Sequence, residues 1–165
     1  MRTLIIIIIS TIGFYGNNSN FIKKYSPPFK QEDFINVKSY FGKNYNPLPI
    51  NYKPRNHKGI VVELKNDAPI ISIDNGTIRK TCDNCSKTKG KLVEIEYENE
   101  LVVKYYHLGK ISVKEGEKIH KNQIIGISGQ TGMTIVNSIG IQTIKSDQII
   151  DPLKILEIRD EKQEK

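Results

Sequence analysis

Residues 91–108 read KLVEIEYENELVVKYYHL, and this stretch decides the fold. In its first half Val93, Ile95 and Tyr97 alternate with glutamates, as in a strand that buries one face. The polar Glu-Asn-Glu at 98–100 interrupts this pattern. Because apolar residues resume directly afterwards, the stretch predicts a hairpin of two antiparallel strands.

The returning strand is expected to place Leu101, Val103, Tyr105 and His107 on one face, because side chains alternate along a strand. The rest of the sequence repeats this texture of short apolar runs separated by turn residues. The runs lie at 60–64, 69–73, 77–78, 92–97, 101–106, 124–128 and 139–144. Many short strands at this spacing predict an all-β fold, an antiparallel β-sandwich or barrel.

Outside these runs the chain divides into segments of different composition. Residues 1–16 combine one positive charge, a short apolar run and small residues, which predicts a secretory signal peptide. A membrane anchor needs roughly 20 apolar residues, so we expect no stable anchor after cleavage. Residues 17–34 are polar and carry a Pro-Pro pair, which favours a linker. The predicted domain is 35–156, followed by a charged tail at 157–165.

The composition limits the function classes. The chain has 165 residues, 38% hydrophobic and 26% charged, which is enough for one folded domain. Its formal net charge of +7 is spread over several lysine groups, and no nucleic-acid recognition motif accompanies it. In an exported protein this charge favours anionic polymers of the cell envelope over nucleic acid. The expected location is the periplasm or the extracellular side of the envelope.

Five segments, in order, resemble one known family. They read VKSYFGKNYNP at 37–47, NHKGIVV at 56–62, DAPIISIDNGTI at 67–78, YYHLGKISVKEGEKIHKNQIIGISGQTG at 105–132, and Asp-Pro at 151–152. In this order and spacing they are similar to the zinc endopeptidases of the lysostaphin/LytM type, which cleave peptidoglycan. The resemblance implies the family's antiparallel β fold, the duplicated hybrid motif, over about 37–156.

The resemblance also implies where a catalytic zinc would bind. The family's first ligand, a histidine, falls on His57. Its aspartate ligand falls on Val61, and its His-X-His pair falls on Ser138 and Gly140, of which the second would be a ligand. A zinc site needs three protein ligands and an open position for water. Two of those three are therefore replaced by residues that cannot bind metal, and we expect no metal cofactor.

The remaining candidate residues have weaker support. The resemblance places His107 beside the zinc water, where it would stabilise charge on the cleaved carbonyl, so here it is a catalytic remnant. We expect His57, Tyr105 and His107 to line a remnant binding cleft. Glu63 or Asp147 could complete an atypical zinc set only through an unexpected register. His120 lies in a lysine-rich turn and is expected at the surface.

Cys82 and Cys85 are the only cysteines. In an exported protein two cysteines most simply form one disulfide, here across a very short loop. A thioredoxin-type redox motif would need a βαβ context that this sequence lacks. A four-ligand zinc site of both cysteines with His107 and His120 has the spacing of no compact zinc module.

Together these features predict a catalytically inactive, exported LytM-like domain that binds peptidoglycan or regulates a cell-wall hydrolase. Relatives with lost ligands activate cell-wall amidases, so the resemblance makes an amidase a candidate partner. The alternatives are an active zinc metalloendopeptidase that cleaves peptidoglycan cross-links with an atypical ligand set, and a purely structural envelope protein.

The disulfide gives a direct test. Replacing Cys82 and Cys85 with serine should lower thermal stability under oxidising conditions only, because the loop closure exists only when the sulfurs are joined. Thermal unfolding of the wild type and the double variant, each with and without reductant, measures this. Equal wild-type stability with and without reductant would argue that no disulfide forms.

Overall fold

The computed structural model describes residues 23–45 and 55–160. Short 3-10 turns lie at η1 (Gln31–Asp33) and η2 (Pro152–Lys154), and the other regular elements of the described residues are strands joined by turns and loops. No helix within the described residues is long and apolar enough to cross a membrane. The strands are β1 (Phe34–Ser39), β2 (Asn44–Tyr45), β3 (Arg55–Asn56), β4 (Ile60–Leu64), β5 (Pro69–Ile71), β6 (Gly76–Cys82), β7 (Lys91–Tyr97), β8 (Leu101–Leu108), β9 (Lys110–Ile111), β10 (Lys118–Ile119), β11 (Ile124–Ile127), β12 (Ser138–Lys145) and β13 (Gln148–Ile150).

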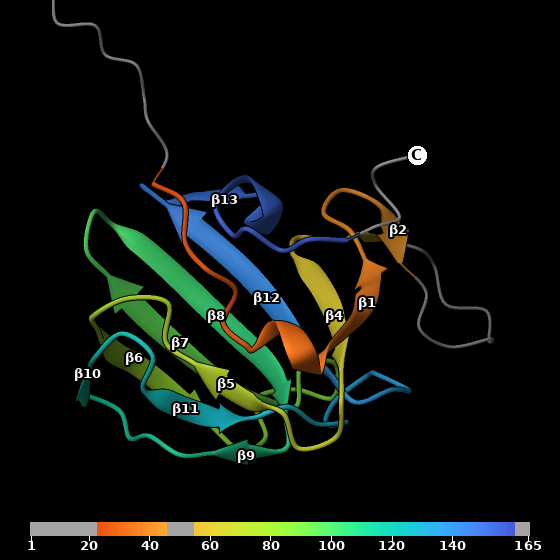
Figure 1. Ribbon diagram of the computed structural model, residues 1–165, viewed down its shortest axis with the longest axis horizontal. Coiled ribbons are helices and arrows are strands. Elements are labelled where there is room, and N and C mark those ends of the chain that lie inside the picture. Colours follow the sequence, from red (N-terminus) through yellow and green to blue (C-terminus); the bar gives the residue numbers. More distant parts are fainter. Residues whose placement is uncertain (1–22, 46–54, 161–165) are drawn as a thin grey trace, which may run out of the picture.

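The strands form one large sheet, one small sheet of three strands, and the two-stranded pair β2-β3. The large sheet has the order β1-β4-β12-β8-β7-β6-β10, with β13 paired to β12, and the small sheet has the order β5-β11-β9. Every pairing is antiparallel. In Figure 1 β5, β11 and β9 cover one face of β6, β7 and β8. The expected all-β, antiparallel fold is therefore confirmed.

The hairpin predicted from residues 91–108 is present. Strands β7 and β8 pair with Glu96 opposite Val102. Asn99 and Glu100 both have φ near +59°, which is the conformation that the two central residues of a tight type I′ hairpin turn require. The turn thereby sets the register of β7 against β8.

The core lies between the two sheets. Val93, Ile95 and Tyr97 are 0–4% exposed and belong to the core cluster, as their alternation with glutamates predicted. Ile70 and Ile125 of the small sheet complete this cluster. One face of the large sheet thus packs against the core, and the side chains of the intervening residues point to the opposite face.

The linker predicted at 17–34 is wrong for its described part. Tyr25 and Phe29 are 7% and 3% exposed and belong to the core cluster. Tyr25 also forms a parallel bridge with Leu156, which attaches this segment to the end of the domain. No local pattern in the sequence indicates this docking, because the contacts that hold it have no local periodicity. The predicted signal peptide, 1–16, lies outside the described residues.

The first residues of the charged tail predicted at 157–165 are attached to the domain. The Glu157 amide donates a hydrogen bond of 3.0 Å to the Tyr25 carbonyl, and the Tyr25 amide donates one of 2.8 Å to the Ile155 carbonyl. The Tyr40 hydroxyl donates to the Asp160 carboxylate. Burial, together with this carboxylate, raises the pKa of Tyr40 to about 12. The domain therefore extends at both ends beyond 35–156, while 161–165 lie outside the described residues.

Docking of the amino-terminal segment is testable through Phe29. Its ring stacks on Phe34 with centroids 6.1 Å apart. Phe29→Ala should lower the free energy of unfolding by about 3 to 5 kcal/mol, because it removes a buried aromatic side chain. Urea denaturation measures the loss. The matched control is Ile35→Ala, whose side chain is 49% exposed and should cost far less; equal losses would contradict the docking.

Candidate functional site

The positions that the family resemblance assigns to zinc ligands lie together on the large sheet. Val61 on β4 is the direct partner of Gly140 on β12. Gly140 is in turn the direct partner of Tyr106 on β8. Val61 is fully buried but is not a member of the core cluster, unlike its neighbours on β4. These residues therefore occupy the face of the sheet that is turned away from the core.

His57 reaches the same place from the segment that precedes β4. Its backbone is fixed by the turn after β1: the His57 amide donates to the Lys43 carbonyl, and the Gly42 amide donates to the His57 carbonyl. Its ring is held on both sides. Nδ1 lies 3.0 Å from the Ser39 hydroxyl oxygen, and Nε2 lies 3.2 Å from the Tyr106 hydroxyl oxygen.

The His57 ring is neutral near pH 7. Burial lowers its pKa, and a hydrogen bond with the Gly59 backbone opposes this only partly. A neutral imidazole has one donor and one acceptor nitrogen, whereas a hydroxyl can act as either. The hydroxyls of Ser39 and Tyr106 therefore satisfy both ring nitrogens, whichever tautomer is present.

The Tyr106 ring lies directly on Gly140. A Cβ atom added at Gly140 would be 1.9 Å from Cε2 and 2.2 Å from Cδ2 of Tyr106. A Cβ atom at Gly59 would be 3.1 Å from the Tyr106 hydroxyl oxygen and 2.3 Å from the Ile141 carbonyl oxygen. Two glycines thus make room for one buried tyrosine. We call Ser39, His57, Gly59, Tyr106 and Gly140 the Tyr106 site.

His107 sits at a β-bulge beside this site. Lys91 pairs with Leu108 and Leu92 with Tyr106, so His107 is the extra residue, and its φ is +68°. Its Nδ1 donates to the Thr131 carbonyl oxygen at 2.7 Å. Burial lowers the pKa of His107, the Thr131 hydrogen bond opposes this, and the nearby His57 lowers it further. Tyr106 lies beside both histidines: its hydroxyl oxygen is 3.2 Å from Nε2 of His57, and its ring centroid is 4.9 Å from that of His107.

Tyr105 does not belong to the site, and its prediction as a cleft residue is wrong. Its side chain is fully buried in the core, with its hydroxyl 3.4 Å from that of Tyr97. The prediction assumed that Tyr105 and His107 share a strand face. Tyr105 continues the alternation of Leu101 and Val103 into the core, whereas the bulge takes His107 out of that alternation. The sequence reasoning consequently missed Tyr106. The doublet of tyrosines before the histidine was the available signal.

The residues of this site do not fit a catalytic zinc. Val61 and Gly140 carry no donor atom, and the space above Gly140 is filled by the Tyr106 ring. Among residues 23–45 and 55–160, no three or more His, Cys, Asp or Glu side chains are grouped so that they could hold a metal ion. Zinc needs three such ligands.

The residues considered for an atypical ligand set are placed elsewhere. The Glu63 carboxylate accepts a hydrogen bond from Asn36 at 2.8 Å and pairs with Lys38 at 3.2 Å. Asp147 follows β12, seven residues beyond Gly140, which corresponds to about 20 Å along an extended strand. His120 is exposed on the turn after β10, as expected.

The two cysteines are joined. Cys82 and Cys85 form a disulfide between the end of β6 and the following loop, with Cα atoms 5.5 Å apart. Their sulfurs are therefore occupied by each other, and the zinc site considered for these cysteines with His107 and His120 is not assembled in the described part of the chain.

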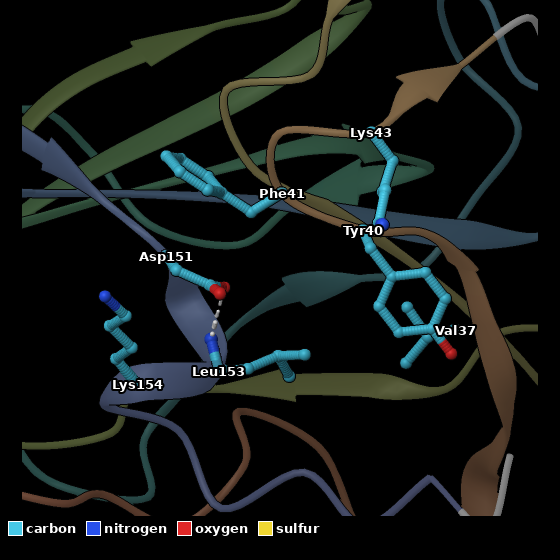
Figure 2. A pocket seen from close by; sticks show the side chains of 7 residues that line it. All are labelled: Val37, Tyr40, Phe41, Lys43, Asp151, Leu153 and Lys154. Carbon is cyan, nitrogen blue, oxygen red and sulfur yellow. Dashed lines mark hydrogen bonds between the residues drawn. The ribbon is translucent and has the colours of Figure 1, made fainter. Parts of the chain in front are cut away.

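A pocket of about 620 Å³ borders the turn that holds His57. Figure 2 shows Tyr40 and Phe41 from this turn facing the residues of η2 across the pocket, with Lys43 and Lys154 on opposite sides. The Asp151 carboxylate accepts a hydrogen bond of 3.0 Å from the Leu153 amide and thereby caps the start of η2. The pocket therefore combines aromatic walls with two lysines. Its lining residues are Val37, Tyr40, Phe41, Lys43, Asp151, Leu153 and Lys154.

Fold and site together define a β-sandwich of the lysostaphin/LytM type in which most zinc ligands are replaced. Residues 55–152 match Peptidase family M23, so the chain belongs to this family. The peptidoglycan DD-endopeptidase ShyC of Vibrio cholerae is 30% identical over 128 residues, covering 74% of this chain and 28% of that protein. This chain spans between 22% and 38% of the length of the curated relatives it matches.

Two solved structures show the same fold. A chain of the SpoIIQ–SpoIIIAH pore-forming complex superimposes with a TM-score of 0.69 at 23% identity, covering 82% of this chain and 92% of that one. The catalytic domain of lysostaphin from Staphylococcus simulans superimposes with a TM-score of 0.57 at 25% identity, covering 70% and 90%. The expected LytM-type fold is thereby confirmed.

The two buried histidines predict a pH dependence of stability. Their pKa values are lowered in the folded state, so below the ordinary value near 6.5 the unfolded chain binds more protons. Stability is therefore full above about pH 6.5 and falls as the pH decreases through it. His107→Gln should flatten the slope between pH 7.5 and 5 by up to about 1.4 kcal/mol per pH unit.

Urea denaturation at several pH values measures this slope. The matched control is His120→Gln, because this histidine lies on an exposed turn outside the site. A wild-type stability that rises on acidification would contradict the prediction, as would equal slopes for His107→Gln and the wild type.

Proposed function

We propose that this chain is a catalytically inactive, exported M23 domain that binds peptidoglycan or regulates a cell-wall hydrolase. The observation that carries the proposal is the pair Val61 and Gly140, which face each other across β4 and β12 at two ligand positions. Neither has a donor for zinc. Without the metal no water is activated near neutral pH, and the endopeptidase reaction has no nucleophile.

The state of His107 supports the loss of catalysis. Its Nδ1 proton is used by the Thr131 carbonyl, and its ring is 3% exposed, with the Tyr106 ring edge-on at 4.9 Å between centroids. A residue that stabilises a developing oxyanion must reach the reacting carbonyl. A ring enclosed in this way is positioned as a structural residue.

The pocket beside the His57 turn supports a binding role. Lys43 and Lys154 have no ion-pair partner among the described residues, and they stand beside aromatic and aliphatic walls. Peptide stems of peptidoglycan and acidic segments of proteins both carry carboxylates. A carboxylate can pair with a lysine while apolar groups contact Tyr40 and Phe41, and such charge-assisted contacts favour orientation and specificity.

Relatives support both arms of the proposal. ShyC is a peptidoglycan DD-endopeptidase, so a cell-wall target belongs to this family. The structural neighbour from the SpoIIQ–SpoIIIAH complex has this fold in an assembly of two proteins. At 23% identity that likeness concerns the fold alone, and it favours a protein partner only as a precedent for the architecture.

Zinc content and peptidoglycan assays test the proposal. The purified chain, dialysed without chelator, should contain far less than one zinc per molecule and should release no material from peptidoglycan. It should instead sediment with isolated sacculi or raise the activity of an added cell-wall amidase. About one zinc per chain with digestion would establish the atypical endopeptidase. Neither binding nor stimulation would overturn the proposal in favour of a structural role.

The same assays locate the binding surface. Lys43→Gln together with Lys154→Gln should weaken sedimentation or amidase stimulation about fivefold, because two partly desolvated ion pairs are lost. The matched control is Lys87→Gln with Lys114→Gln, two exposed lysines away from the pocket. An equal effect of both double variants would show that only net charge matters.

A further inference from the structure

This site differs from a zinc site by a specific steric conflict. In the Tyr106 site one aromatic side chain lies where a ligand side chain at position 140 would have to stand. The ring atoms Cε2, Cδ2 and Cζ of Tyr106 are 1.9, 2.2 and 2.3 Å from a Cβ at that position. Cβ contacts this short do not occur in folded proteins, so a histidine at 140 and this tyrosine position exclude each other.

The ring cannot move aside easily. Tyr106 is 6% exposed, and the conflicting atoms belong to the middle of its ring rather than to the tip of a flexible chain. Close packing in protein interiors leaves little room for such a shift. The Lys89 ammonium also lies over the ring, 5.7 Å from its centroid.

We propose that Tyr106 has taken over the structural role of the metal ion in this chain. A bound zinc joins side chains from different segments into one rigid unit. Here the hydrogen-bonded series Ser39, His57, Tyr106 joins β1, the segment before β4, and β8 in the same place. The tyrosine both fills the space left by the lost ligands and supplies the partner that buried His57 needs.

Gly59 and Gly140 are part of this replacement. A cross-strand aromatic ring that covers a glycine shields its backbone and contributes packing that the glycine lacks. Gly140 is the direct cross-strand partner of Tyr106, while Gly59 faces its hydroxyl end. Position 140 therefore requires glycine only because any Cβ atom there would overlap the Tyr106 ring. This inference concerns stability and metal binding, so it can fail while the proposed function stands.

A cycle of alanine variants tests the dependence. Gly140→Ala should lower the melting temperature by about 10 °C when Tyr106 is present, because of the overlap with its ring. In the Tyr106→Ala background the same change should cost less than about 3 °C, because the overlap is gone. Thermal unfolding of the four proteins measures the coupling.

The matched control is Gly126→Ala in both backgrounds. A Cβ at Gly126 would be 2.6 Å from the Lys110 carbonyl oxygen, a conflict that does not involve Tyr106. Its cost should therefore be the same with and without Tyr106. The proposal is overturned if Gly140→Ala behaves like this control.

Zinc titration gives a second readout. Val61→Asp with Gly140→His restores the family's ligand types, and with Tyr106 retained it should bind no zinc. Adding Tyr106→Ala should yield about one zinc per chain, measured with zinc chloride against a chromophoric chelator. Equal zinc binding with Tyr106 present overturns the proposal, as does a folded triple variant that binds none. If the triple variant does not fold, the alanine cycle decides.

Discussion

Alternation of side chains across the large sheet is the constraint on which the rest of the structure depends. Ile60, Val62 and Leu64 of β4 enter the core between the sheets, and Val61 points to the other face. Antiparallel pairing then brings Gly140 opposite Val61. Residues distant in sequence form one site because period-two alternation and register leave them no other place.

The same alternation explains what sequence reasoning could find. Strand β4 lies where its apolar run predicted, and the β7–β8 hairpin follows from its alternation and turn. Positions 61 and 140 were paired through the family resemblance, and the observed register agrees with that assignment. Signals that depend on local periodicity or on a fixed family spacing are therefore readable from one sequence.

Structural features that interrupt the strand periodicity could not be predicted from the sequence. Regular alternation from Leu101 and Val103 puts Tyr105 in the core and Tyr106 on the other face, but the bulge takes His107 out of the face that it was expected to share with Tyr105. The docking of Phe29 depends on contacts with residues far away in the chain, and neighbouring prolines made its segment resemble a linker. In both cases tertiary packing decided the outcome, which no window of sequence contains.

The persistence of the fold without its metal ligands has a physical reason. The two replaced ligand positions, Val61 and Gly140, lie on the face of the large sheet that is turned away from the core, whereas the free energy of folding comes chiefly from the core between the sheets. The replaced ligands therefore affect only the surroundings of His57 and the space above Gly140. Tyr106 on the adjacent strand occupies both places: its hydroxyl lies within hydrogen-bond distance of His57, and its ring covers Gly140. Because the position of its ring excludes any side chain at 140, a zinc site at this place would require several simultaneous changes.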